Sequence, residues 1–110
     1  MIELTILEYL KDNLDASVYL EEPTEKPDRY VLFEKTSSGK NNQLRLATFA
    51  FQSYANSLYE AAHLNEKLKT VLDEMGELDY FGRVKLNSDY NFTDTTTKRY
   101  RYQAVYDFVY

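Results

Sequence analysis

The chain of 110 residues has no cysteine, no tryptophan and a single histidine, and only three glycines and two prolines. The absence of cysteine excludes disulfides and thiolate chemistry. A catalytic or metal-binding histidine needs partners, and His63 falls in an expected helix. Its polar neighbours along that helix are Glu60, Asn65, Glu66 and Lys67. We therefore expect His63 to be a helix-surface residue.

Other chemical motifs are equally weak. The acidic pairs Glu21–Glu22, Asp73–Glu74 and Glu77 with Asp79 lack the spacing of a calcium loop. The run Ser37–Lys40 lacks the first glycine, the hydroxyl residue after the lysine and the following helix of a phosphate-binding loop. We expect solvated charge and a hairpin tip instead. The sequence therefore predicts a protein that is not an enzyme and binds no metal or cofactor.

The net charge of −5 argues against sequence-independent binding of nucleic acid, which needs lysine and arginine on phosphates. It leaves open a local patch, and Lys98–Tyr102 interleaves basic and aromatic residues. The run is explained equally well as an edge strand whose positive charges prevent pairing with the strands of other molecules. The first ten residues have neither a basic start nor a long apolar run, so we expect no signal peptide, no membrane span and a cytoplasmic protein.

Tyrosine is abundant, with eleven copies. Near the C-terminus, aromatic residues and one alanine occupy every second position: Tyr100, Tyr102, Ala104, Tyr106, Phe108 and Tyr110. Side chains two apart in a strand share one face. Eleven residues span roughly 35 Å, so this strand must bend or reach beyond its domain. We expect its end to lie in the core, covered by a long helix, and its start to be a contact surface.

Periodicity elsewhere predicts two helices and four further strands. The helices are expected at 2–14 and 57–75, and the strands at 17–21, 29–35, 43–54 and 81–86. Ser57 and Glu60 have capping-box form, with Asn56 a rival cap, and Gly76 suits the position after the helix.

Two polar stretches are harder to assign. We expect Thr36–Asn42 to be a flexible loop, whereas Asn87–Lys98 either continues a strand or forms the loop of a long hairpin. The whole is a single α+β domain: a mostly antiparallel sheet of four to five strands packed against two helices, with a projecting hairpin.

Three stretches, Phe51–Ala62, Val84–Thr95 and Tyr100–Tyr106, together with the length and element order, resemble the tail terminators of long-tailed bacteriophages and prophages. The resemblance implies a small α/β fold that assembles with itself into a hexameric ring. It implies that the ring caps the tail tube, stops its polymerisation and joins the tail to the head. The family has no catalytic motif.

The partners implied by the resemblance are other copies of the chain, the tail tube protein and the head–tail connector protein. Neither a membrane nor a specific nucleic acid is implied, although DNA passing through the ring is compatible with it. The implied location is the host bacterial cytoplasm during assembly and then the tail-neck region of the virion. The alternatives are another head–tail joining or minor tail protein, or a small non-catalytic adaptor that binds a partner at its sheet edge.

A ring requires a head-to-tail interface, in which two different patches meet. We expect these patches in Thr36–Asn42 and Ser88–Lys98, with Tyr90 and Phe92 either as aromatic anchors or as part of the monomer's core. The candidate interface residues are Ser38, Lys40, Asn41, Asn42, Asp89, Tyr90, Phe92, Arg99 and Arg101.

Overall fold

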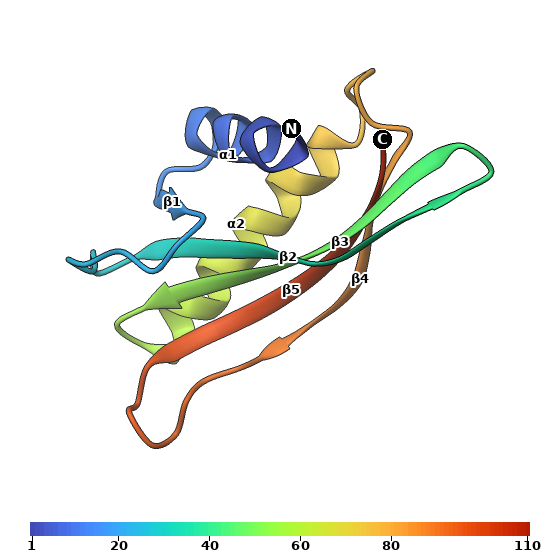
Figure 1. Cartoon of the computed structure of the whole chain (residues 1–110). Coiled ribbons are helices and arrows are strands. Elements are labelled where there is room, and N and C mark those ends of the chain that lie inside the picture. The colour runs from blue at the N-terminus through green and yellow to red at the C-terminus, as the bar shows by residue number, and fades with distance from the viewer.

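A computed structural model describes all 110 residues. The elements are α1 (Ile2–Asn13), β1 (Ser17–Tyr19), β2 (Tyr30–Asn41), β3 (Leu44–Ala55), α2 (Leu58–Met75), β4 (Arg83–Asn91) and β5 (Tyr100–Val109). The strands form one sheet in the order β1-β2-β3-β5-β4, in which only the β1–β2 pair is parallel. Figure 1 shows the two helices beside this curved sheet. The expected α+β fold with a mostly antiparallel sheet is confirmed.

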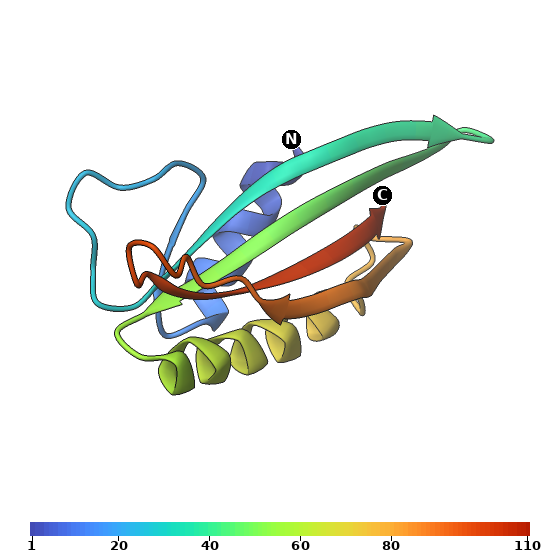
Figure 2. The same cartoon turned by 90° about the horizontal axis from the view of Figure 1, so that it is seen from below.

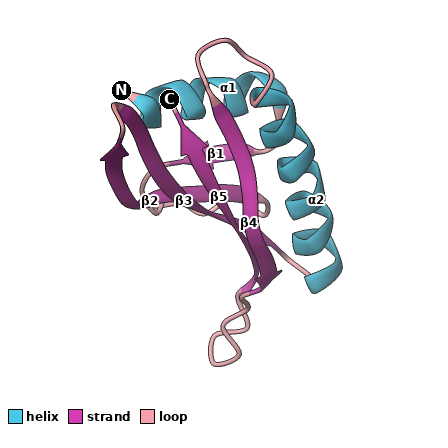
Figure 3. Cartoon of the chain, turned by 90° about the vertical axis from the view of Figure 1, so that its right-hand side faces the viewer, coloured by secondary structure: helices cyan, strands magenta, loops and turns pink.

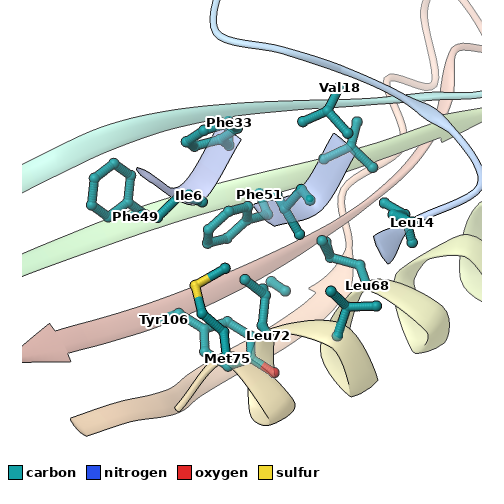
Figure 4. Packing of buried hydrophobic residues seen from close by; sticks show 14 of the residues in the cluster. Ile6, Leu14, Val18, Phe33, Phe49, Phe51, Leu68, Leu72, Met75 and Tyr106 are labelled. Atoms are coloured by element: carbon teal, nitrogen blue, oxygen red, sulfur yellow. The ribbon is translucent and has the colours of Figure 1, made fainter. Parts of the chain in front are cut away.

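The core lies between both helices and one face of the sheet (Figure 4). Apolar residues four apart on α2 are fully buried: Leu64, Leu68 and Leu72. They meet aromatic side chains of the central strands, where Phe51 and Tyr106 pack edge to face with centroids 6.0 Å apart. On β5 the buried residues Ala104, Tyr106 and Phe108 follow the predicted alternation, while Tyr100 and Tyr102 are half-buried. The end of this strand thus belongs to the core.

The boundaries of α2 are set by local chemistry. Ser57 is the N-cap, and its hydroxyl accepts a hydrogen bond of 3.1 Å from the Glu60 amide. Gly76 is not in the left-handed conformation expected after a helix, because its φ is −62°. A Cβ at Gly76 would lie 3.3 Å from the Cβ of Val84. Glycine therefore lets the helix end lie close to β4 without crowding Val84.

The expected loop at Thr36–Asn42 is wrong. The strand β2 continues to Asn41 after a register shift between Lys35 and Ser37. Only Asn42 and Gln43 form the turn, with φ of 49° and 69°. Two successive residues with positive φ are typical of the tight turn that suits twisted hairpin strands.

Strand β4 begins two residues later than expected, at Arg83. The segment Asn87–Lys98, for which a continued strand and a hairpin loop were both open, contains the end of this strand and the turn that follows it. The strand continues through Asn91, and the remaining residues form the turn into β5. A register shift between Leu86 and Ser88 inserts an extra residue. Because side chains alternate between faces, this bulge turns Asp89 toward the helices and Tyr90 toward the opposite side.

Candidate interaction surfaces

The structure has two surfaces that lie outside the helix-packed core. One is the projecting hairpin, which we define as Thr36–Arg45, and the other is the open face, the side of the sheet away from the helices. Figure 2 shows the hairpin extending past the C-terminus at one end, and the turn between β4 and β5 lying at the other. The molecule measures 43 Å along its longest axis.

The projecting hairpin contains four of the expected interface residues: Ser38, Lys40, Asn41 and Asn42. Strand β1 pairs with β2 only as far as Leu32, so the outer edge of β2 is free beyond that point. At the base, the Tyr110 amide donates a hydrogen bond of 3.0 Å to the Arg45 carbonyl. All ten residues from 36 to 45 are exposed, including Leu44 at 53%. The hairpin therefore offers both faces and its tip to a partner.

The charges of the hairpin work against its own stability. Lys40 and Arg45 are direct cross-strand partners, and the hairpin contains no carboxylate. Like charges opposite one another destabilise a strand pair, and neither side chain forms an ion pair within the molecule. A feature that costs local stability without an internal compensation favours an external role.

The second group of expected residues gathers at the opposite end, around a pair of tyrosines. The strand register places Tyr30, Tyr54 and Arg101 side by side on the open face. The two tyrosine rings stack with centroids 4.7 Å apart, and Arg101 Nη1 donates to the Tyr54 hydroxyl at 2.9 Å. The guanidinium of Arg99 lies 4.7 Å from the centroid of the Tyr54 ring.

Both arginines are engaged within the fold. Arg99 donates to the Tyr30 hydroxyl and, at 3.3 Å, to Glu22. Arg101 Nε donates to the Phe92 carbonyl at 2.6 Å, and its guanidinium lies 4.4 Å from the Phe92 ring centroid. These contacts fasten the β4–β5 turn to the middle of the sheet. Both expected interface arginines thus also hold this turn against the sheet.

Burial, hydrogen bonds and neighbouring charges shift the pKa values of Tyr30 and Glu22 in this cluster. Burial, reinforced by the hydrogen bond to Glu22, raises the pKa of the Tyr30 hydroxyl far above its usual range. Burial alone would raise the pKa of the Glu22 carboxyl, but hydrogen bonds from Tyr30 and Arg99 hold it below its usual value. At neutral pH the cluster therefore pairs a carboxylate with a guanidinium across a neutral tyrosine.

Tyr90 and Phe92 do not close the core. They are 42% and 38% exposed, and their rings meet edge to face with centroids 5.9 Å apart. The Tyr90 hydroxyl accepts a hydrogen bond of 2.5 Å from Gln103, which in turn accepts one of 2.9 Å from Gln52. This aromatic pair is held in place on the open face and remains accessible.

Asp89 has a different position from the one expected of an interface residue. The bulge in β4 points it at α2, where it accepts hydrogen bonds from Asn65 at 2.9 Å and from Lys69 at 2.7 Å. Asn65 is only 1% exposed. Asp89 therefore joins β4 to the long helix.

An acidic groove lies on the open face beside the Tyr30–Tyr54 pair. It consists of two adjoining depressions, of about 300 and 640 Å³, that share Leu20, Glu21 and Glu22. Glu34 and Leu32 also line the smaller one, and neither depression is lined by lysine or arginine. Sequence reasoning missed this groove, because its residues come together only through the path of the chain from β1 to β2.

Comparison with models of known protein families and with curated proteins finds no match for this chain. No group of three or more histidine, aspartate or glutamate side chains is placed to hold a metal ion. Neither helix has the length and apolar character needed to cross a membrane.

Proposed function

We propose that this chain is a structural subunit that joins other copies head to tail, and that it acts as a phage tail terminator. In this role a closed hexameric ring caps the tail tube, stops its polymerisation and meets the head–tail connector. The observation that carries the proposal is the projecting hairpin, whose tip has no partner within its own molecule. The resemblance in the sequence supplies the biological setting: assembly in the host bacterial cytoplasm and a place in the virion neck.

The positions of the two surfaces support a head-to-tail contact. The hairpin tip and the acidic groove differ in shape and lie on different parts of the molecule (Figure 3 shows the sheet from the side of the hairpin). Contacts between unlike patches produce rings when the rotation closes and filaments when it does not. The net charge of −5 also suits a channel that DNA traverses without adhering.

A second candidate function is an adaptor that binds a partner strand along a free sheet edge. The observation that favours it is the outer edge of β4, which has no neighbour anywhere from Arg83 to Asn91. Such edges accept an added strand through backbone hydrogen bonds. Another head–tail joining protein or a minor tail protein would use the same surfaces with different partners.

Sedimentation velocity over a concentration series, followed by negative-stain microscopy, tests the assembly. We expect the wild-type chain to form a ring. Replacing residues 40–45 with an Asn-Gly turn should abolish the ring, because it removes the hairpin tip. The fold should be retained, because all six replaced residues are exposed. The circular dichroism spectrum of this shortened variant should match that of the wild type. A protein that stays monomeric at millimolar concentration would contradict the proposal.

The terminator role needs its own measurement. Purified tail tube protein polymerises in the presence of the wild-type chain or of the shortened variant, and tube lengths are measured by microscopy. The wild type should stop elongation and the shortened variant should not. Rings that leave tube length unchanged would favour a different neck protein, and capture of a single extended peptide along β4 would favour the adaptor.

A further inference from the structure

We infer that the projecting hairpin of one copy inserts its cationic tip into the acidic groove of the next copy. The inference rests on the proposed head-to-tail assembly and adds the two patches that meet. Its basis is the charge and shape of the projecting hairpin and the acidic groove, both of which carry charged side chains without an ion pair inside the molecule.

The inserted element carries two cations on one face and one exposed apolar residue, Leu44, on the other. Lys40 and Arg45 are paired across the hairpin, so their side chains lie on the same face, while the exposed Leu44 points to the opposite face. A tip that enters a groove is contacted on both faces. The two cations would then meet carboxylates, and Leu44 would meet an apolar wall.

The receiving site matches this pattern. Glu21 and Glu34 are exposed and form no ion pair within the molecule. The apolar wall is supplied by Leu20 and Leu32, which are half-buried. Two unpaired cations therefore face two unpaired carboxylates, and insertion relieves the repulsion between Lys40 and Arg45.

A nearby depression serves as an internal comparison. It has a volume of about 440 Å³ beside the Tyr30–Tyr54 pair, and its lining includes three cations, Lys26, Lys98 and Arg99, against one carboxylate, Asp28. Those cations would repel the tip of the hairpin. The sign of the charge thus selects the groove at Glu21 and Glu34 as the receiving site.

Charge reversal on each patch tests this pairing. The hairpin variant carries Lys40→Glu and Arg45→Glu, and the groove variant carries Glu21→Lys and Glu34→Lys. Each variant alone should assemble at least about tenfold more weakly than the wild type, because like charges then face each other. An equimolar mixture should recover assembly, since the reversed hairpin fits the reversed groove and the two unchanged patches fit each other.

The control variant, Lys11→Glu with Arg83→Glu, makes the same change in net charge as the hairpin variant, at exposed cations that form no ion pair and lie outside both patches. It should assemble like the wild type. All variants are compared by sedimentation velocity at about 0.1 M and 1 M salt, where the screening length falls from about 10 Å to about 3 Å. Wild-type assembly should weaken at high salt.

The outcomes separate the two proposals. If both reversed variants assemble like the wild type, or if the mixture recovers nothing, the hairpin–groove pairing is wrong while head-to-tail assembly stands. If the wild type itself never assembles, both are wrong. Loss of assembly in the Lys11 and Arg83 control as well would show that net charge, and not this pairing, governs association.

Discussion

Replacing Asp89 with alanine should destabilise the fold without acting on a partner surface. The change removes the acceptor shared by Asn65 and Lys69. The side-chain oxygen of Asn65 already lacks a hydrogen-bond partner, so the whole amide would be left unsatisfied at a position that is 1% exposed. Leaving one buried polar group unpaired costs about 1–3 kcal/mol.

The ion pair adds a smaller amount. Lys69 Nζ lies 2.7 Å from Asp89, and the two side chains are 17% and 26% exposed. Its second carboxylate partner, Glu66, is 71% exposed and compensates little. Loss of a pair near the surface costs up to about 1 kcal/mol. The total is about 1–4 kcal/mol, which lowers the melting temperature by about 5–20 °C in a domain of this size.

Urea unfolding followed by circular dichroism measures this free energy. Asp89→Asn should cost about half as much, because its amide oxygen still accepts from Asn65 while the charge opposite Lys69 is gone. Asp79→Ala is the matched control at an exposed carboxylate without an ion pair, and it should stay within about 0.5 kcal/mol of the wild type. An Asp89→Ala protein as stable as the control would refute the anchoring role.

Three further outcomes are expected. Tyr106→Ala should lower the free energy of unfolding by about 3–5 kcal/mol in urea titrations, because a fully buried ring is lost, and a cost below 1 kcal/mol would contradict its core position. Gly76→Ala should cost about 1 kcal/mol by the same method, because the new methyl group crowds Val84; a stabilised variant would show that β4 yields freely. Burial raises the pKa of the Tyr30 and Tyr106 hydroxyls, so these groups stay protonated in the fold while the unfolded chain ionises near its ordinary value of 10.0. Their contribution to stability is complete below that pH and is lost as the pH rises above it, so urea midpoints should fall from about pH 9 to pH 11, less steeply in Tyr106→Phe.

The elements predicted correctly from the sequence are those with one buried side, because burial of one side gives the sequence a periodic pattern of apolar residues. Leu64, Leu68 and Leu72 repeat at the helical spacing because one side of α2 faces the core, and Ala104, Tyr106 and Phe108 alternate because one side of β5 does. The arm of β2 after Lys35 has no buried side chain. Its sequence therefore shows no alternation of apolar and polar residues, and for this reason it was predicted to be a loop.

The candidate site was predictable only where it is continuous in sequence. The exposed hairpin residues were found because they are polar neighbours in one stretch. The direction of the Asp89 side chain was not predictable, because a single extra residue in β4 reverses which face each later side chain occupies. The contact between Arg99 and Tyr30 joins residues 69 positions apart. Such contacts depend on strand order, which the pattern of one strand does not contain.

The hairpin tip has a consequence for the timing of assembly. Its last two pairs, Lys40–Arg45 and Asn41–Leu44, have no covering layer, and a two-stranded ribbon by itself is barely stable in water. Amide protons there exchange through local opening that costs almost no free energy, whereas those of the core exchange only on global unfolding. A docked tip loses this freedom. Slower hydrogen exchange at these few amides would then report the fraction of hairpin tips that are docked, without any label on the chain.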